Sequence, residues 1–153
     1  MPSVSVRMDL SAPIEVLWDS LVRIEEFPEF MDDVQWIRVL KRSGNRRLAA
    51  WSVLLRGSVL QWSEEAVLDA AGHRIQFEQI DGDLSIFRGS WQLAGLASDR
   101  TRASLHVEFE IGIPLMAQML NPVAKQSLES NATRMFKALE ERGQMGSAMH
   151  MPG

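Results

Sequence analysis

The chain has 153 residues, of which 46% are hydrophobic and 24% are charged, and its formal net charge at pH 7 is −4. These values are typical of one globular domain with a real core, and the acidic balance argues against nucleic acid as a partner. Cysteine is absent, which excludes disulfides, thiol catalysis and thiolate metal ligands. No apolar run approaches the roughly 20 residues that span a bilayer, and no signal peptide is recognisable, so we expect no membrane insertion and a cytoplasmic location.

The first forty residues predict a strand followed by two short helices. Apolar and polar residues alternate over residues 4–10, which indicates a half-buried strand. Residues 11–13 (Ser-Ala-Pro) are a helix-start signal, and apolar side chains then recur at i, i+3, i+4 and i+7 from Ile14. Residues 24–31 contain a proline and several large apolar side chains and predict a second short helix or a turn.

The middle of the chain alternates between strand-like segments and tight turns. Each segment has one apolar and one polar face, as expected for a sheet with one solvated side. Because the connections are short, neighbouring strands should be antiparallel. The six predicted strands are residues 34–41, 48–56, 59–68, 73–80, 85–93 and 101–111.

The longest predicted element is a helix over residues 113–142. Pro114 suits its first turn, where a missing N–H costs nothing. Pro122 is expected to kink or break the helix, and Gly143 is expected to end it.

An apolar stripe along this helix includes Leu128 and Met135 and needs a surface to lie on. The apolar face of the predicted sheet supplies that surface. Residues 144–153 are expected to form a disordered tail, which leaves residues 1–143 as a single ligand-binding domain.

This order of elements resembles the START-like, or SRPBCC, superfamily, and three segments carry the resemblance. Residues 11–40 (SAPIEVLWDSLVRIEEFPEFMDDVQWIRVL) look like the opening of its polyketide cyclase and ubiquinone-binding-protein branch. Residues 75–93 (IQFEQIDGDLSIFRGSWQL) look like that branch's strand, acidic/Gly turn and strand ending in Gly-x-Trp. Residues 113–141 are similar to its C-terminal helix, so the likeness covers about residues 3–142.

The resemblance implies an α+β helix-grip fold. In this fold a curved seven-stranded antiparallel sheet wraps around the long C-terminal helix, with two short helices after the first strand. A deep cavity between sheet and helix is also implied. Members bind lipids, isoprenoid quinones or polyketides there, and the aromatase/cyclases fold and dehydrate a carrier-bound polyketide. From the residues alone, a solidly filled core is the alternative to a cavity.

Aromatic side chains are plentiful on the apolar faces that would line this cavity, and the chain has five tryptophans. Each large ring buries about 150–250 Å², which suits a flat or long apolar ligand. The candidate ligand-binding residues are Trp36, Trp51, Trp62, Phe77, Phe87, Trp91, Leu128 and Met135.

Phe27, Phe30 and Met31 lie between the first helix and the next strand. In the helix-grip fold this region lies near the cavity entrance, so the resemblance implies a hydrophobic lid. A plug that seals the end of the core is the alternative.

Glu64, Gln79 and Asn131 share the apolar faces and are the candidate catalytic residues. A carboxyl group in an apolar cavity has a raised pKa and can exchange protons near neutrality. Glu64 shares strand parity with Trp62, but Glu65 points inward if the opposite face is the buried one. Gln79 and Asn131 can hold a ligand carbonyl or hydroxyl; alternatively, Gln79 lies at a solvated strand end and Asn131 bonds the backbone.

Metal, nucleotide and triad chemistry have little support in the sequence. The histidines are His73, His106 and His150, and no two of them have metal-ligand spacing. No glycine-rich phosphate loop occurs. We therefore expect no metal and no cofactor.

One departure from the resembled aromatase/cyclases concerns their cavity arginine. It lies on the strand that corresponds to residues 59–68, where this chain has Ala66. Either the chemistry differs, or another group such as Arg56 substitutes, or the protein only binds its ligand. Arg88 is a further candidate anchor at the cavity mouth.

Two main functions follow as hypotheses. The first is a polyketide cyclase/aromatase-like enzyme that directs cyclisation and dehydration of a bound polyketide. The second is a non-catalytic carrier for a lipid, isoprenoid quinone or hydrophobic natural product, and a partner-binding module that uses the lid surface is a third. An acyl carrier protein is an expected partner of the enzyme, and Arg42, Arg46 and Arg47 could supply a basic docking rim.

Overall fold

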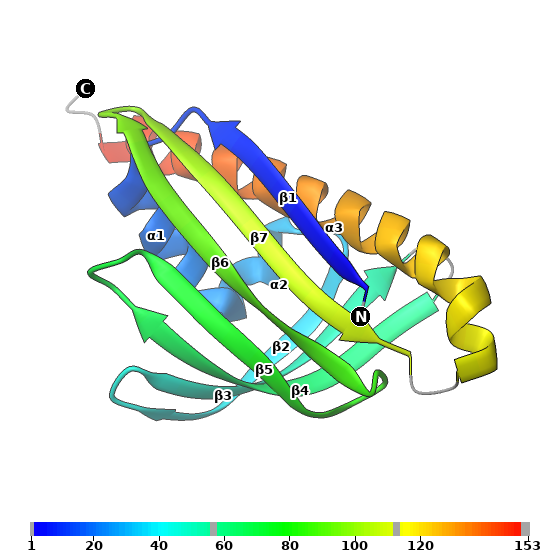
Figure 1. Cartoon of the computed structure of the whole chain (residues 1–153). Helices are drawn as coiled ribbons and strands as arrows, with labels where there is room; N and C mark the ends of the chain where they lie inside the picture. The colour runs from blue at the N-terminus through cyan, green and yellow to red at the C-terminus, as the bar shows by residue number, and fades with distance from the viewer. Residues whose placement is uncertain (1, 56–57, 112–113, 151–153) are drawn as a thin grey trace.

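Seven antiparallel strands, two short helices, a 3₁₀ turn and one long helix form the described part of the molecule in a computed structural model, which describes residues 2–55, 58–111 and 114–150 (Figure 1). The predicted fold class is confirmed. The strands are β1 Ser3–Leu10, β2 Val34–Ser43, β3 Arg46–Leu55, β4 Ser58–Asp69, β5 Arg74–Gly82, β6 Ile86–Ala97 and β7 Arg100–Glu110. The helical segments are α1 Ile14–Val22, the 3₁₀ turn η1 Ile24–Glu26, α2 Phe27–Phe30 and α3 Pro114–His150.

The sheet has the order β1-β7-β6-β5-β4-β3-β2, so consecutive strands from β2 to β7 are neighbours and β1 closes against β7. Burial alternates along β7, where Ala103, Leu105, Val107 and Phe109 face the core. Figure 1 shows the sheet curving around one side of α3, with α1 and α2 on the same side as that helix. The apolar faces of the strands and the apolar stripe of α3 therefore meet in one core.

Helix α3 begins at Pro114 and continues through Pro122. Proline in a helix interior removes one backbone hydrogen bond and bends the axis. The helix changes direction in its yellow N-terminal part, so Pro122 bends α3 without ending it (Figure 1).

Our prediction that Gly143 ends this helix is wrong, because α3 continues to His150. A Cβ atom at Gly143 would lie 3.1 Å from Ala12 Cβ and 3.3 Å from Leu17 Cδ2. Glycine there permits close contact with the segment around α1 instead of capping the helix. Residues 144–150, expected in a disordered tail, continue α3, and residues 151–153 lie outside the described part of the chain.

The close packing of β6 against β7 requires glycine at position 89, and this requirement can be tested. A Cβ at this position would lie 2.0 Å from the backbone oxygen of His106 on β7. We expect Gly89→Ala to destabilise the protein by about 1–3 kcal/mol or more, because backbone atoms must shift to admit the methyl group. Gly95→Ala on the same strand meets nothing closer than 4.0 Å and should change stability by less than about 0.5 kcal/mol. Urea denaturation of both variants measures the difference, and equal stabilities would contradict the packing assigned to Gly89.

Candidate active site

A small cavity lies between the inner face of the sheet and α3. Its volume is about 40 Å³. Such a space holds a few waters at most. The lining residues are Val4, Trp51, Val53, Leu60, Trp62, Glu64, Phe77, Phe87, Trp91, Leu105, Val107, Leu128, Asn131 and Met135.

Stacked aromatic rings explain why the cavity is so small. Trp51 and Trp62 are paired across β3 and β4, and their rings stack at 5.3 Å with 13° between planes. Phe87 packs on Trp62 at 4.8 Å, and Phe77 packs on Phe87 at 5.6 Å. The structure therefore lies between a deep cavity and a solidly filled core, because a chamber exists but side chains nearly fill it.

The structure brings together all the candidate ligand-binding residues except Trp36. A β-bulge between Val34 and Trp36 changes the parity of β2, so Ile37 is the next buried residue after Val34. Trp36 is half-buried, with the Arg38 guanidinium 4.8 Å above its ring. The prediction for Trp36 is thus wrong, because the bulge turns it away from the cavity.

Glu64 faces the cavity with 3% of its surface exposed, whereas Glu65 is exposed and paired with Arg46. Burial raises the pKa of Glu64 to about 7 from its ordinary 4.5. Three groups oppose this shift: a hydrogen bond from the Trp62 indole Nε1 to Glu64 Oε1 (2.9 Å), the charge of Arg47, and the nearby Trp51 indole. Glu64 is therefore poised to exchange a proton near neutral pH.

Two further polar groups line the cavity without a hydrogen-bond partner. They are Nε1 of Trp51, which has no hydrogen-bond geometry to any acceptor, and Nδ2 of Asn131. Both residues are buried. Buried donors without acceptors are costly, so the cavity offers two donors to a ligand that carries acceptors.

Gln79 does not line the cavity, although it pairs with Glu64 across β4 and β5. Its Nε2 donates to the backbone oxygen of Leu84 at 2.6 Å. The residue lies where β5 has left β6, since their pairing stops at Glu78 and Arg88. Gln79 is therefore a strand-end residue, which was the alternative. Its prediction as a catalytic residue in the cavity is wrong.

The predicted entrance residues divide into two groups. Phe27 is fully buried, and its ring packs 5.9 Å from that of Trp51. This position fits the alternative in which Phe27 seals the end of the core. Phe30 and Met31 line a surface depression of about 220 Å³ beside α3. Met135 lines both this depression and the inner cavity, so it borders both spaces.

Arg47 is buried, which contradicts the prediction that it belongs to a basic rim at the surface. It is 3% exposed and donates from Nη1 to the backbone oxygen of Val22 at 3.1 Å. A sequence signal for this position exists, because Arg47 shares strand parity with Trp51 and Val53, whose side chains are also buried. Arg47 is therefore not part of a surface rim.

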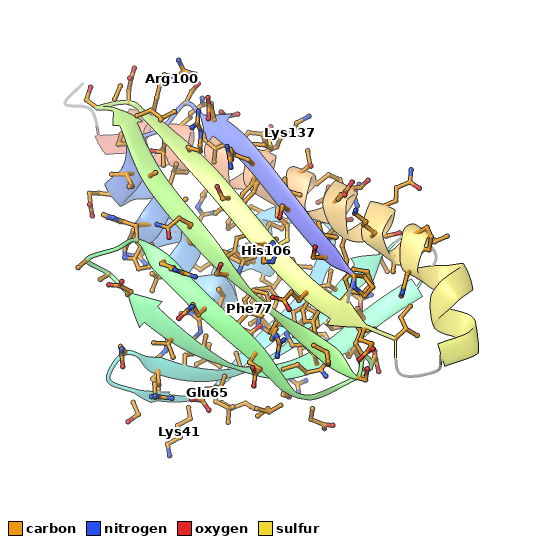
Figure 2. All side chains as sticks on the ribbon, viewed as in Figure 1. Lys41, Glu65, Phe77, Arg100, His106 and Lys137 are labelled. Carbon is orange, nitrogen blue, oxygen red and sulfur yellow. The ribbon has the colours of Figure 1, made fainter. Side chains whose placement is uncertain are left out.

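The other charged candidates lie on the outer surface or outside the described residues. Arg42 pairs with Glu25 at 3.0 Å, and Arg46 pairs with Glu65, whose side chain lies with Lys41 at the lower edge of the sheet (Figure 2). Arg88 is exposed and pairs with Glu108. Arg56 lies outside the described residues. The expected basic rim is thus reduced to arginines that already have acidic partners.

The histidines with described side chains take part in surface contacts. His73 lies 2.9 Å from Glu15, and His106, on the outward face of β7, lies 2.8 Å from Ser5 (Figure 2). The described residues contain no cluster of three metal-ligating side chains of the His, Cys, Asp and Glu types. Within the same residues, no helix is both long and apolar enough to span a bilayer.

Comparisons with known proteins agree with this geometry. Residues 10–136 match the sequence profile of the family described as polyketide cyclase / dehydrase and lipid transport. The bifunctional cyclase/dehydratase of the actinorhodin polyketide synthase of Streptomyces coelicolor is 25% identical over 131 residues. That match covers 84% of this chain but only 40% of the longer relative.

Solved structures show the same fold. The protein TTHA0849 from Thermus thermophilus superposes with a TM-score of 0.88 at 25% identity, over 95% of this chain and 99% of the other. The Zhui aromatase/cyclase of Streptomyces sp. R1128 superposes with a TM-score of 0.81 at 16% identity, over 93% of each chain. From the profile match, which spans most of its length, the chain belongs to the polyketide cyclase / dehydrase and lipid transport family.

Proposed function

We propose that this protein binds a hydrophobic poly-β-carbonyl compound in the inner cavity and catalyses its cyclisation and dehydration without a cofactor. The observation that carries the proposal is the buried Glu64 carboxyl group, whose pKa is about 7 in a mostly apolar chamber. Membership of the family supports the same class of substrate.

The chemistry requires one group that first removes and then returns a proton. As a carboxylate, Glu64 takes a proton from the acidic carbon between two carbonyl groups. The resulting enolate attacks a second carbonyl carbon, which forms a C–C bond and opens the C=O π bond, and Glu64 returns its proton to the alkoxide to give a β-hydroxy carbonyl. Glu64 then takes a second proton from the carbon next to the one that carries the hydroxyl group and delivers it to that hydroxyl group, which leaves as water while a C=C bond forms. A side chain whose pKa lies near the working pH performs both steps best.

Trp51 and Asn131 supply the hydrogen bonds that this reaction needs. Their indole and amide N–H groups have no partner and line the same chamber as Glu64. Donors held in a dry site stabilise negative charge that develops on a carbonyl oxygen. An alkyl chain would leave both donors unpaired, so the cavity favours a ligand rich in carbonyl oxygens.

Binding of a polyketide requires the 40 Å³ chamber to expand. Leu128, Asn131 and Met135 form the α3 side of the wall. Methionine has three rotatable bonds and adapts to irregular shapes. We therefore propose that Met135 moves when the ligand binds, which joins the chamber to the depression beside Phe30 and Met31.

A direct test compares Glu64→Gln with Glu65→Gln, the neighbouring residue on the outer face. The substrate is an N-acetylcysteamine thioester of a synthetic poly-β-ketone, and chromatography measures cyclised product. We expect Glu64→Gln to lower the rate by about 10²–10⁴-fold, because the amide cannot transfer protons. Glu65→Gln should keep the wild-type rate. Wild-type turnover that survives Glu64→Gln would overturn the proposed role.

The apolar lining supports a second candidate function, that of a carrier for a lipid or other hydrophobic molecule. Glu64 and Asn131 are the lining residues with strongly polar side chains, and the family description includes lipid transport. Native mass spectrometry of the purified protein distinguishes the two functions. An intact hydrophobic ligand that is retained by wild type and by Glu64→Gln alike, without turnover of the thioester, would favour the carrier.

A further inference from the structure

Arg47 is a buried charge close to Glu64. On adjacent strands, Ala49 pairs with Glu64 and Arg47 pairs with Ala66, so Arg47 and Glu64 are diagonal neighbours on one face of the sheet. Diagonal neighbours lie within reach when one side chain is long. Ala49 and Ala66 are fully buried and small, which leaves room for the arginine side chain on the inner face.

The contacts of Arg47 do not explain why a charged side chain is buried at this position. Nη1 donates to the backbone oxygen of Val22, the last residue of α1, and a cation is favourable at a helix C-terminus. Nε is buried and has no hydrogen-bond partner. Among the residues that the structure describes, Arg47 has no carboxylate within salt-bridge distance. A helix cap alone does not require a guanidinium group that is buried and only partly bonded.

We propose that Arg47 is a positioning residue for Glu64: its uncompensated charge on the inner face of the sheet keeps the buried carboxyl group able to release its proton near neutral pH. This role rests on the proposed function of Glu64 as an acid and base. Without a neighbouring cation, a carboxyl group in an apolar chamber holds its proton to much higher pH. Arg47 thus allows Glu64 to ionise, so that its carboxylate can remove a proton from the substrate.

The surroundings of Glu64 contain no competing charge in the described part of the chain. From β5, the neutral Gln79 pairs with it, and from β4 itself the indole of Trp62 bonds it. From α3, the neutral Asn131 faces the shared cavity. Arg47 itself is influenced by Arg42 and Glu25, which are paired with each other and have opposite charges. Burial lowers the pKa of Arg47, and the charge of Glu64 raises it, as expected for an interacting pair.

The pH dependence of the NMR signals from the indole N–H groups tests this inference without any substrate. The Trp62 N–H donates to Glu64, so its chemical shift should titrate with Glu64 at a midpoint of about pH 7. The Trp36 signal, outside the cavity, is the internal reference. In Arg47→Met, which replaces the charge with an apolar chain of similar length, we expect the midpoint to rise by about one pH unit or more. Arg47→Lys should restore most of the wild-type midpoint, because it retains the charge.

Two outcomes separate this inference from the proposed function. If Trp62 reports no titration near pH 7 in wild type, the acid–base role of Glu64 fails and the inference fails with it. If wild type titrates there and Arg47→Met has the same midpoint, only the role of Arg47 is overturned. Should Arg47→Met not fold, the Arg47 Nε–H signal of wild type provides the same test. It should shift with pH around neutrality and become insensitive to pH in Glu64→Gln, and an unchanged titration in that variant would overturn the inference.

Discussion

Glu64→Gln should make the protein more stable at pH 8 while removing its proton-transfer chemistry. The folded-state pKa of Glu64 is about 7, against 4.5 for the free side chain. Well below pH 4.5 the carboxyl group is protonated in both the folded and the unfolded protein, so it does not lower the free energy of unfolding. Between pH 4.5 and 7 the unfolded chain loses the proton first, so the free energy of unfolding falls as pH rises. Above pH 7 the loss is complete and amounts to about 3 kcal/mol, at about 1.4 kcal/mol per pKa unit.

Glutamine resembles the protonated form of Glu64 and never ionises, so the variant avoids this loss. Its amide oxygen can still accept the hydrogen bond from Trp62. Urea denaturation at pH 4 and pH 8 should therefore give similar stabilities for variant and wild type at pH 4, and a gain of about 3 kcal/mol for the variant at pH 8.

Glu65→Gln is the matched control for this experiment. Glu65 is exposed and paired with Arg46 at the surface, where an ion pair contributes about 1 kcal/mol at most. A Glu64→Gln variant that is no more stable than wild type at pH 8 would mean that the carboxyl group has its ordinary pKa. The case for acid–base catalysis would then lose its physical basis.

The strands were predictable because nearly every one has one consistently apolar face, whereas the helix-grip arrangement was expected from the family resemblance. Alternation over β7, for example, agrees with the observed burial of Ala103, Leu105, Val107 and Phe109. The aromatic lining follows from the same parity, since Trp51, Phe77, Phe87 and Trp91 lie on inward faces. Periodicity therefore identified most of the cavity wall without knowledge of the turns.

The same reasoning failed where one local feature changes the parity or where both faces are apolar. A bulge in β2 turns Trp36 away from the cavity. In β4, Val59 and Val67 alternate with Trp62 and Ala66, so parity alone did not decide between Glu64 and Glu65. The size of the chamber depends on how indole rings stack across strands, which no sequence pattern contains.

Met135→Ala should lower the stability of the ligand-free protein and, at the same time, create a binding site for small aromatic molecules. Met135 is 5% exposed and lines the inner cavity. Truncation of a buried methionine costs about 2–5 kcal/mol, because packing is lost and a void remains. This void adds to the 40 Å³ already present beside Glu64.

A flat aromatic alcohol such as 2-naphthol is a suitable probe, because it presents an apolar face and an oxygen acceptor. Ligand at 100 times its Kd stabilises a protein by about 2.7 kcal/mol, so saturating 2-naphthol should recover much of the stability lost in Met135→Ala. Thermal unfolding with and without 2-naphthol measures this recovery. Binding should also shift the indole signals of Trp51 and Trp62, which line the cavity.

Leu139→Ala is the control, since Leu139 is buried on α3 but does not line the cavity. It should lose a similar amount, about 2–5 kcal/mol, without shifting the signals of Trp51 and Trp62 when 2-naphthol is added. If Met135→Ala binds no 2-naphthol, the space beside Glu64 is a packing defect and the chamber does not receive ligands. If it binds while wild type does not, Met135 is the side chain that closes the chamber, and a natural ligand must supply enough binding energy to displace it.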